Sequence, residues 1–323
     1  MARSLLRGGQ AKGGVFTWTL QPTPIATERV DVAGTGDAYA AILTIYIARS
    51  DARIVLVAYE LTWSPLTAGF KDSRFTPDSA VNRSLFNQKI KAGVFADGMS
   101  EAVLYVGNYH DDILGRSVGA ALRRFYEAKF DPAEIRPTEN GPWHPVVLLS
   151  ESLGSIMLFD ALEQEAAYAQ SKEKWQRDAF ARMMASTRVV YMMANQLPLL
   201  DVDRQTTEGS PVRSLQTPSR SRTPTDRLKA LSERRSDAVG KSPLQTAAAP
   251  GPIELVVFSD PSDLLSYQLY PKDVADLPNL RMHDFTPRNT FNWFRLFEWP
   301  ATAHTGYAQN AEVADIVVHG YRK

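Results

Sequence analysis

Short apolar runs without a regular polar alternation recur along the chain and limit the folds that it can adopt. Three of them are IVLVAY at 54–59, VVLL at 146–149 and IELVVF at 253–258. A strand with one face in water alternates apolar and polar residues, whereas a strand covered on both faces is apolar throughout. The runs therefore predict a mostly parallel, open sheet with helices on both faces.

Helical patterns separate these runs, and the alternation of strand and helix is typical of an α/β fold with right-handed connections. The predicted strands are 29–32, 53–59, 146–149, 188–194, 253–258 and 281–285, and the predicted helices are 37–49, 118–129, 153–169 and 172–185.

We expect residues 1–323 to form a single α/β domain, since 44% of the residues are hydrophobic and 22% are charged, which is ordinary globular composition. The segment 203–252 is different, because it is rich in Pro, Ser and Thr and has no aromatic residue. Such a segment buries too little apolar surface to offset the entropy of ordering it. It is predicted to be a flexible insertion, a solvated loop or a lid, with a short helix near 225–235.

Charge and cysteine content exclude several classes of protein. Lys and Arg total 36 and Asp and Glu total 36, so the basic excess of a general nucleic-acid binder is missing. Without cysteine there is no disulfide scaffold, thiolate zinc site or Cys nucleophile, and no His, Asp or Glu spacing indicates a metal or cofactor. The most apolar run, 38–48, is shorter than the roughly 20 residues that cross a bilayer. With no signal peptide evident, a cytoplasmic protein is the expectation.

A strand, a tight turn and a helix follow one another in VVLLSESLGSIMLFDAL, residues 146–162. Ser150, Ser152 and Gly154 are small, as a sharp turn between strand and helix requires, although Ser150 replaces the more usual glycine. Ser152 would present its hydroxyl above the sheet, and the N–H of Leu153 at the helix start would face an anion there. The pattern predicts a nucleophile elbow.

The segments SESLGS, FSDPSDLLSY and AHTGY, in this order, resemble the α/β-hydrolase superfamily in its lipase and esterase branch. The resemblance implies that fold for most of the chain outside 203–252, and a triad in the order nucleophile, acid, histidine. It implies Ser152 as the nucleophile, Asp263 after a late strand as the acid, and His304 as the base.

Other residues compete for two of these roles. Asp260 is the alternative acid, but its place before Pro261 also suits a residue that shapes the turn. Among the later histidines, His283 falls within a predicted strand and His319 near the end of a terminal helix-like stretch. His304 falls in a loop of small residues, where catalytic groups concentrate.

The resemblance also implies a second oxyanion donor after an early strand. Gly34 or Thr35 is the predicted donor, since both follow strand 29–32. A strand, a Gly-x-Gly turn and a helix would also match a dinucleotide-binding loop, but Tyr39 occupies its third small position. Asn195 and Trp63 follow strand ends and, with Asp260, are candidate pocket residues.

We therefore expect a serine hydrolase that cleaves carboxylic esters of small molecules or lipids through an acyl-enzyme, with no cofactor and no nucleic-acid partner. One alternative is a non-catalytic binding protein with the same fold, and another is a thioesterase or acyltransferase with the same triad. The basic residues of 203–252 also allow contact with a membrane surface.

Overall fold

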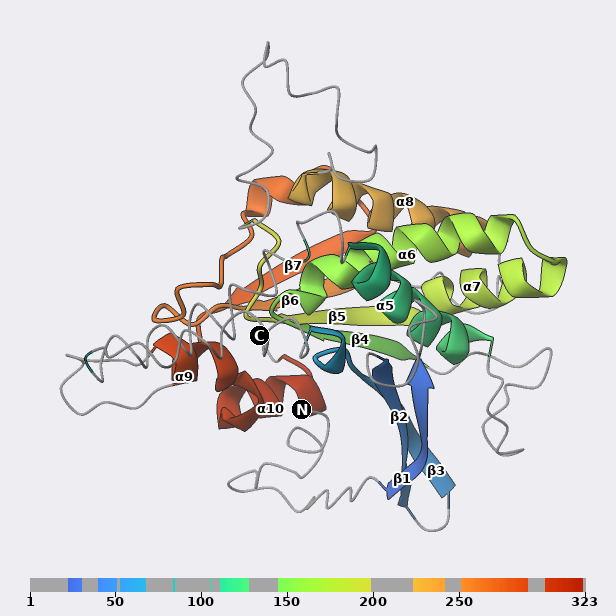
Figure 1. Ribbon diagram of the computed structural model, residues 1–323. Helices are drawn as coiled ribbons and strands as arrows, with labels where there is room; N and C mark the ends of the chain where they lie inside the picture. The colour runs from blue at the N-terminus through green and yellow to red at the C-terminus, as the bar shows by residue number, and fades with distance from the viewer. Residues whose placement is uncertain are drawn as a thin grey trace, which may run out of the picture.

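The computed structural model describes residues 23–30, 40–50, 53–67, 84, 105, 111–127, 145–198, 223–241, 251–289 and 300–321. Their elements form two sheets and a set of helices (Figure 1).

A four-stranded parallel sheet is the centre of the fold. Its strands are β4 (Val146–Glu151), β5 (Thr187–Met193), β6 (Ile253–Phe258) and β7 (Leu280–Phe285), paired in this order. These are four of the strands expected from the apolar runs. The strands are parallel because each connection returns the chain to the amino end of the sheet, and their order is sequential because each strand pairs with the next one along the chain.

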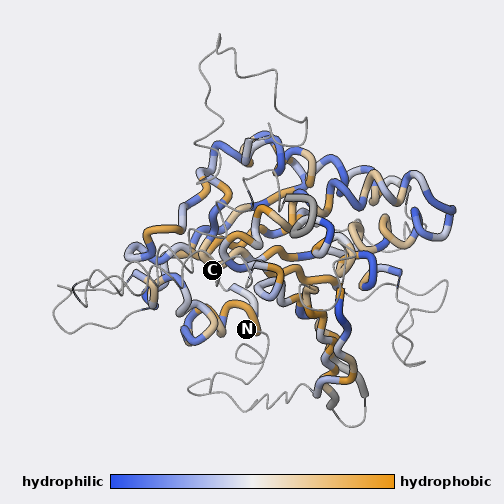
Figure 2. Tube along the Cα trace, viewed as in Figure 1, coloured by the Kyte–Doolittle hydropathy of each residue, from blue (hydrophilic) through white to orange (hydrophobic). Residues whose placement is uncertain are grey.

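Successive residues of β5 point to opposite faces of this sheet, and both faces are buried. Val190 and Met192 belong to one apolar cluster, while Tyr191 and Met193 belong to another. Figure 2 shows the hydrophobic residues gathered in the strands and the hydrophilic ones toward the outer helices. Burial on both faces explains why β5 and β6 lack a polar alternation, whereas in β4 Val147 and Leu149 remain exposed on one face.

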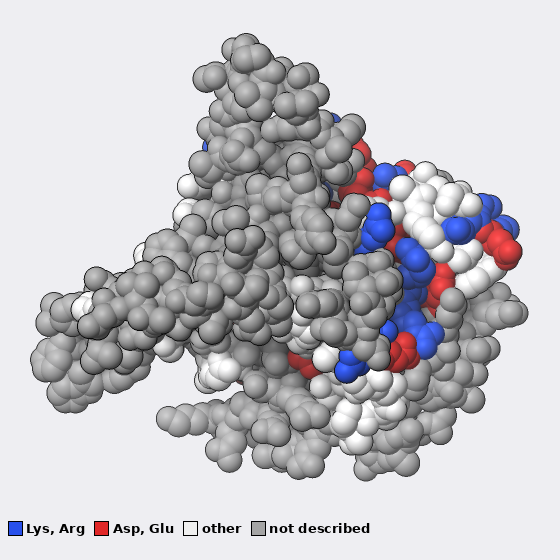
Figure 3. Space-filling model, viewed as in Figure 1, with Lys and Arg blue, Asp and Glu red and all other residues white. Residues whose placement is uncertain are grey.

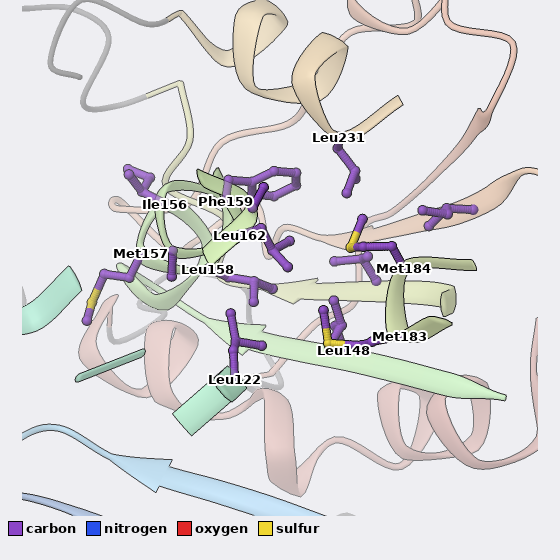
Figure 4. Packing of buried hydrophobic residues seen from close by; sticks show 14 of the residues in the cluster. Leu122, Leu148, Ile156, Met157, Leu158, Phe159, Leu162, Met183, Met184 and Leu231 are labelled. Atoms are coloured by element: carbon purple, nitrogen blue, oxygen red, sulfur yellow. The ribbon is translucent and has the colours of Figure 1, made fainter. Parts of the chain in front are cut away.

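Helices cover each face of the sheet. Helices α5 (Asp111–Tyr126), α6 (Gly154–Gln170), α7 (Lys174–Ser186) and α8 (Pro224–Lys241) contribute to the larger cluster. Figure 4 shows Leu122 of α5, Leu148 of β4 and Met183 of α7 meeting in it. On the opposite face, α10 (Ala311–His319) packs Val313 against the second cluster. The described part of the chain is thus a mixed α/β protein with a parallel sheet between helices.

The predicted helix at 37–49 is wrong. Strand β2 (Ala41–Ser50) takes its place and pairs antiparallel with β1 (Thr23–Val30) and β3 (Arg53–Thr62) in a separate sheet. The stretch ILTIYI is rich in β-branched and aromatic residues, which favours a strand, and β2 pairs with β3 up to Ser50 opposite Arg53. The strands near the N-terminus therefore form an antiparallel sheet of their own instead of extending the parallel one.

Helix α8 lies inside the segment expected to be a flexible insertion. Its Leu228 and Leu231 are buried in the larger cluster. Its Arg227 donates to Asp160 of α6 through Nε at 2.8 Å and Nη2 at 3.2 Å. The short helix foreseen near 225–235 is therefore longer and packed, whereas 203–222 and 242–250 lie outside the described residues.

Buried polar groups also join α5 to α6. Glu165 of α6 accepts from Arg123 Nε at 3.0 Å and Nη2 at 2.5 Å, and from the Tyr126 hydroxyl at 2.8 Å. Outside this pair, Arg124 of α5 binds Glu28 of β1 and so links α5 to the antiparallel sheet. Figure 3 shows acidic and basic side chains side by side on the described part of this surface, in keeping with such ion pairs.

Candidate active site

The turn between β4 and α6 has the geometry expected of an elbow. Ser152 has a φ of 55°, a left-handed conformation that costs a non-glycine residue about 1–3 kcal/mol and persists only where the surrounding structure holds it. Its own N–H donates to the Met193 carbonyl at the end of β5 at 2.8 Å. A Cβ added to Gly154 would lie 3.9 Å from the Cβ of Ser150, in van der Waals contact, so the two residues face each other across the turn. The Ser150 hydroxyl is accommodated because it donates to the Tyr191 carbonyl.

Three side chains from distant parts of the sequence meet at this turn. The Ser152 hydroxyl lies 2.8 Å from Nε2 of His304. Nδ1 of the same ring lies 2.9 and 3.0 Å from the two carboxylate oxygens of Asp263. The structure therefore brings together the three residues that the resemblance to α/β-hydrolases implied.

The hydrogen-bond partners of His304 determine which of its two ring nitrogens carries the proton. The Asp263 carboxylate only accepts hydrogen bonds when ionised, so Nδ1 of His304 carries the proton and donates it. Nε2 then has a free lone pair and accepts from the Ser152 hydroxyl. In this tautomer the ring is ready to remove a proton from the serine.

His304 lies on a short helix, not in the expected loop. Helix α9 (Pro300–Thr305) begins with a proline, which suits the first helical position because no N–H is needed there. After it comes Gly306, where an added Cβ would lie only 2.7 Å from the Asn289 Cβ and the Thr302 carbonyl oxygen. A glycine at 306 is thus required for the close packing that sets α9 against the loop after β7.

The two acid candidates have different roles. Asp263 is fully buried and binds the imidazole, and it also accepts from the N–H of Leu265 at 2.9 Å. Asp260 accepts instead from the N–H groups of Ser262 at 2.7 Å and Asn289 at 2.5 Å. Asp260 therefore shapes the loop after β6, the turn-forming role considered for it above.

Tyr307 links the two acids, and the sequence analysis gave it no role. Its hydroxyl donates to Asp263 Oδ2 at 3.1 Å and accepts from the Asp260 N–H at 2.7 Å. Burial, together with the negative charge of Asp263, raises the pKa of Tyr307 above its usual range, so the hydroxyl remains a donor. Its position three residues after His304 is the signal that would have drawn attention to it.

Gln196 is the second residue that the sequence analysis missed. Its Nε2 donates to the Ser152 hydroxyl oxygen at 2.9 Å, and the residue is 1% exposed. Ala194, two residues before Gln196, has a φ of 49°, which turns the chain after β5 toward the serine. No sequence motif marks this position, because the contact depends on that turn.

Asn195, predicted as a pocket residue, is wholly buried and acts on the backbone. Its Nδ2 donates to the Tyr267 carbonyl at 2.9 Å and its Oδ1 accepts from the Leu197 N–H at 3.2 Å. Its own carbonyl accepts from the Tyr267 N–H at 2.8 Å. Asn195 thus ties the end of β5 to the segment that follows Asp263.

The predicted oxyanion donors have different outcomes. Leu153 lies directly before α6, where the first N–H groups of a helix have no intrahelical partner. Gly34 and Thr35 lie outside the described residues, and the helix expected after them is absent, since β2 follows. That change also removes the strand–turn–helix pattern behind the dinucleotide alternative. Trp63 follows β3 and packs, half-buried, against the larger apolar cluster.

Glu151 lies beside the nucleophile at the end of β4. Burial raises the pKa of its carboxyl, and the positive charge that His304 can carry opposes this shift. A carboxylate in this position favours the protonated imidazole electrostatically.

Comparison of the chain with known protein families, curated proteins and solved structures finds no match. Within the described residues, no group of three or more His, Cys, Asp or Glu side chains is placed to hold a metal ion. Among the helices described, none combines the length and apolar character needed to cross a membrane.

Proposed function

We propose that the protein is a serine hydrolase that cleaves carboxylic esters, an α/β-hydrolase of the lipase and esterase type. The observation that carries the proposal is the hydrogen-bonded chain from the Ser152 hydroxyl through His304 to Asp263, with the serine on a strained strand-to-helix turn. A serine hydroxyl is a weak nucleophile until a base removes its proton, and this chain supplies that base.

The reaction would proceed in two halves. His304 takes the Ser152 proton as the oxygen attacks the ester carbonyl, and then gives that proton to the leaving alcohol. Water attacks the resulting acyl-enzyme in the same way and releases the acid. Asp263 holds the imidazole in its tautomer and stabilises its charged form. General-base help of this kind typically contributes about 10²–10⁴-fold in rate.

The arrangement of the strands supports the same function. Ser152 follows β4, Asp263 follows β6 and His304 follows β7, so all three lie beyond the carboxyl ends of parallel strands. Active sites of open α/β sheets are found at this edge. In Figure 1, α9 lies near this edge.

An apolar substrate, such as a lipid ester, fits the loop that carries the acid. Leu264, Tyr267 and Tyr270 follow Asp263 and are exposed. Exposed apolar side chains beside a reactive centre favour contact with an acyl chain. A thioesterase or acyltransferase would use the same triad, and a profile of ester and thioester substrates separates these reactions.

Active-site labelling tests the proposal. The wild-type protein is expected to react with a fluorophosphonate and to hydrolyse p-nitrophenyl butyrate, because Ser152 is activated. Ser152→Ala should lose the label and lower kcat by about 10⁶-fold, the effect of losing a triad nucleophile. Ser171→Ala, which removes an exposed hydroxyl at the end of α6, is the matched control and should keep both. A wild-type protein without label or turnover would favour the non-catalytic alternative.

A further inference from the structure

The side-chain amide of Gln196 contacts the nucleophile Ser152, as the triad base His304 does, but it comes from the segment that follows β5. Its Nε2–H donates at 2.9 Å to the Ser152 hydroxyl oxygen, the atom that would bond to the substrate carbonyl carbon. General-base catalysis needs only His304 on this hydroxyl. The additional donor is thus not explained by the proton transfer.

The backbone that carries Gln196 is held in a strained conformation. Ala194 has a φ of 49° although it has a side chain, and it is fully buried. The bonds of Asn195 to the segment around Tyr267 fix the residue between them. A strained residue persists only where its surroundings hold it, and such residues cluster at active sites. Here the strain directs the next side chain but one toward Ser152.

The other end of the same carboxamide is not anchored. Gln196 Oε1 is buried and has no hydrogen-bond partner among the described residues. A buried unpaired oxygen is unfavourable, and native proteins contain few. A Gln that served only to stabilise the fold would be expected to pair both ends. Among the described residues the amide is hydrogen-bonded only to Ser152, so no second hydrogen bond holds its N–H away from the reacting atoms.

We propose that Gln196 is a catalytic residue that donates its amide N–H to the oxyanion, completing an oxyanion hole with the N–H of Leu153. This inference rests on the proposed hydrolase function. It replaces Gly34 and Thr35 as the source of the second donor with a side chain that follows β5.

The charge movements of the reaction agree with this role. As Ser152 Oγ bonds to the ester carbon, its proton passes to His304 and the carbonyl π pair moves onto the carbonyl oxygen. That oxygen, which is two bonds from Oγ through the carbonyl carbon, becomes the stronger acceptor, and the hydrogen bond of the Gln196 N–H switches to it. When the pair returns and the bond to the leaving oxygen breaks, the N–H returns to Oγ. Donors aimed where charge develops stabilise the transition state more than the substrate.

The experiment uses Gln196→Met, which keeps the length of the side chain without its hydrogen bonds, and Gln196→Glu, which places an acceptor there. Both should lower kcat for p-nitrophenyl butyrate by about 10²–10³-fold, the loss expected for one oxyanion donor, with a smaller change in KM. Gln170→Met, at an exposed position near the end of α6, is the control and should keep wild-type values. Thermal unfolding reports whether each variant is folded.

A second readout separates oxyanion binding from mere orientation of the serine. A trifluoromethyl ketone labelled with ¹³C at its carbonyl forms a hemiketal on Ser152, and ¹³C NMR follows ionisation of its oxygen. We expect the hemiketal pKa to be higher in Gln196→Met than in the wild type, because the anion has lost a donor. An unchanged hemiketal pKa, or a kcat within about threefold of the wild type, would overturn the inference and leave the hydrolase intact. A wild-type protein that neither turns over ester nor forms the adduct would overturn the hydrolase itself and this inference with it.

Discussion

Two buried carboxylates in this protein have almost the same surroundings and different consequences. Asp263 beyond β6 and Glu165 in α6 have side chains that are 0% and 3% exposed. Each accepts from a buried tyrosine hydroxyl, Tyr307 at 3.1 Å and Tyr126 at 2.8 Å. The difference is the remaining partner, which is His304 in one case and Arg123 in the other.

That partner decides what a buried carboxylate can do. An arginine keeps its proton at any accessible pH and binds both carboxylate oxygens, so the Glu165 pair only fixes α5 to α6. A histidine gains and loses a proton readily and has a second nitrogen to act through. Both carboxylates accept from a tyrosine, so a buried tyrosine–carboxylate hydrogen bond does not by itself indicate an active site.

Exchange of each carboxylate for its amide should give the largest contrast between the two regions. Asp263→Asn is expected to lower kcat by about 10⁴-fold with little loss of stability, because the amide favours the wrong tautomer of His304. Glu165→Gln should leave the kcat of folded protein unchanged and lower the free energy of unfolding by about 1–3 kcal/mol, because Arg123 loses its counter-charge. Asp260→Asn is the control for the acid and should retain most activity.

The measurements are ester hydrolysis per folded molecule and urea-induced unfolding. A lower rate per folded molecule in Glu165→Gln would show that the region around Glu165 also affects the active site. Full activity in Asp263→Asn combined with none in Asp260→Asn would reverse the assignment of the acid.

Removal of the two tyrosine hydroxyls should give a smaller contrast. Tyr307→Phe takes a donor from Asp263 and an acceptor from the Asp260 N–H, so kcat should fall about tenfold, equivalent to about 1.4 kcal/mol. Tyr126→Phe removes only a bond to Glu165 and should cost about 1 kcal/mol of stability without affecting kcat. Equal effects of both variants on kcat would argue that Tyr307 has only a packing role.

Glu151→Gln should give the smallest effects: the stability of the protein should rise while kcat falls. Because burial raises the pKa of Glu151 in the folded state, its charge lowers stability at neutral pH, and the amide should raise the unfolding midpoint. This gain should shrink as the pH falls toward the ordinary value of 4.5 and the wild-type carboxyl takes up its proton. The kcat should drop by less than about tenfold, because the imidazolium loses a nearby negative charge. Calorimetry at pH 4 and pH 7 with parallel rate measurements checks both signs, and a midpoint gain that is larger at pH 4 would contradict the assignment.

The sequence predicted the elements whose local pattern agrees with their place in the fold. Strands β5 and β6 are largely apolar because both their faces are covered, and the small residues around Ser152 are what a tight elbow requires. The helix expected at 37–49 failed because a run of alanines next to β-branched residues satisfies either structure, and pairing with β3 decided between them.

Within the site, Ser152, Asp263 and His304 could be predicted, because the resemblance implies a triad in the order nucleophile, acid, histidine. The prediction did not reach Gln196, whose direction depends on a left-handed turn at an alanine that no local preference indicates. Tyr307 was equally hidden, since its contact with Asp263 exists only once the loops after β6 and β7 lie together.

Strand β5 contributes none of the three triad side chains, yet the residues at its end hydrogen-bond both to the nucleophile turn and to the loop that carries the acid. The carbonyl of Met193 holds the backbone of Ser152, and two residues later Asn195 holds the segment that follows Asp263. Any displacement of this short stretch therefore carries the nucleophile and the acid-bearing loop in the same direction. Thermal motion can shift the whole assembly against the rest of the sheet while the spacing between its parts is preserved.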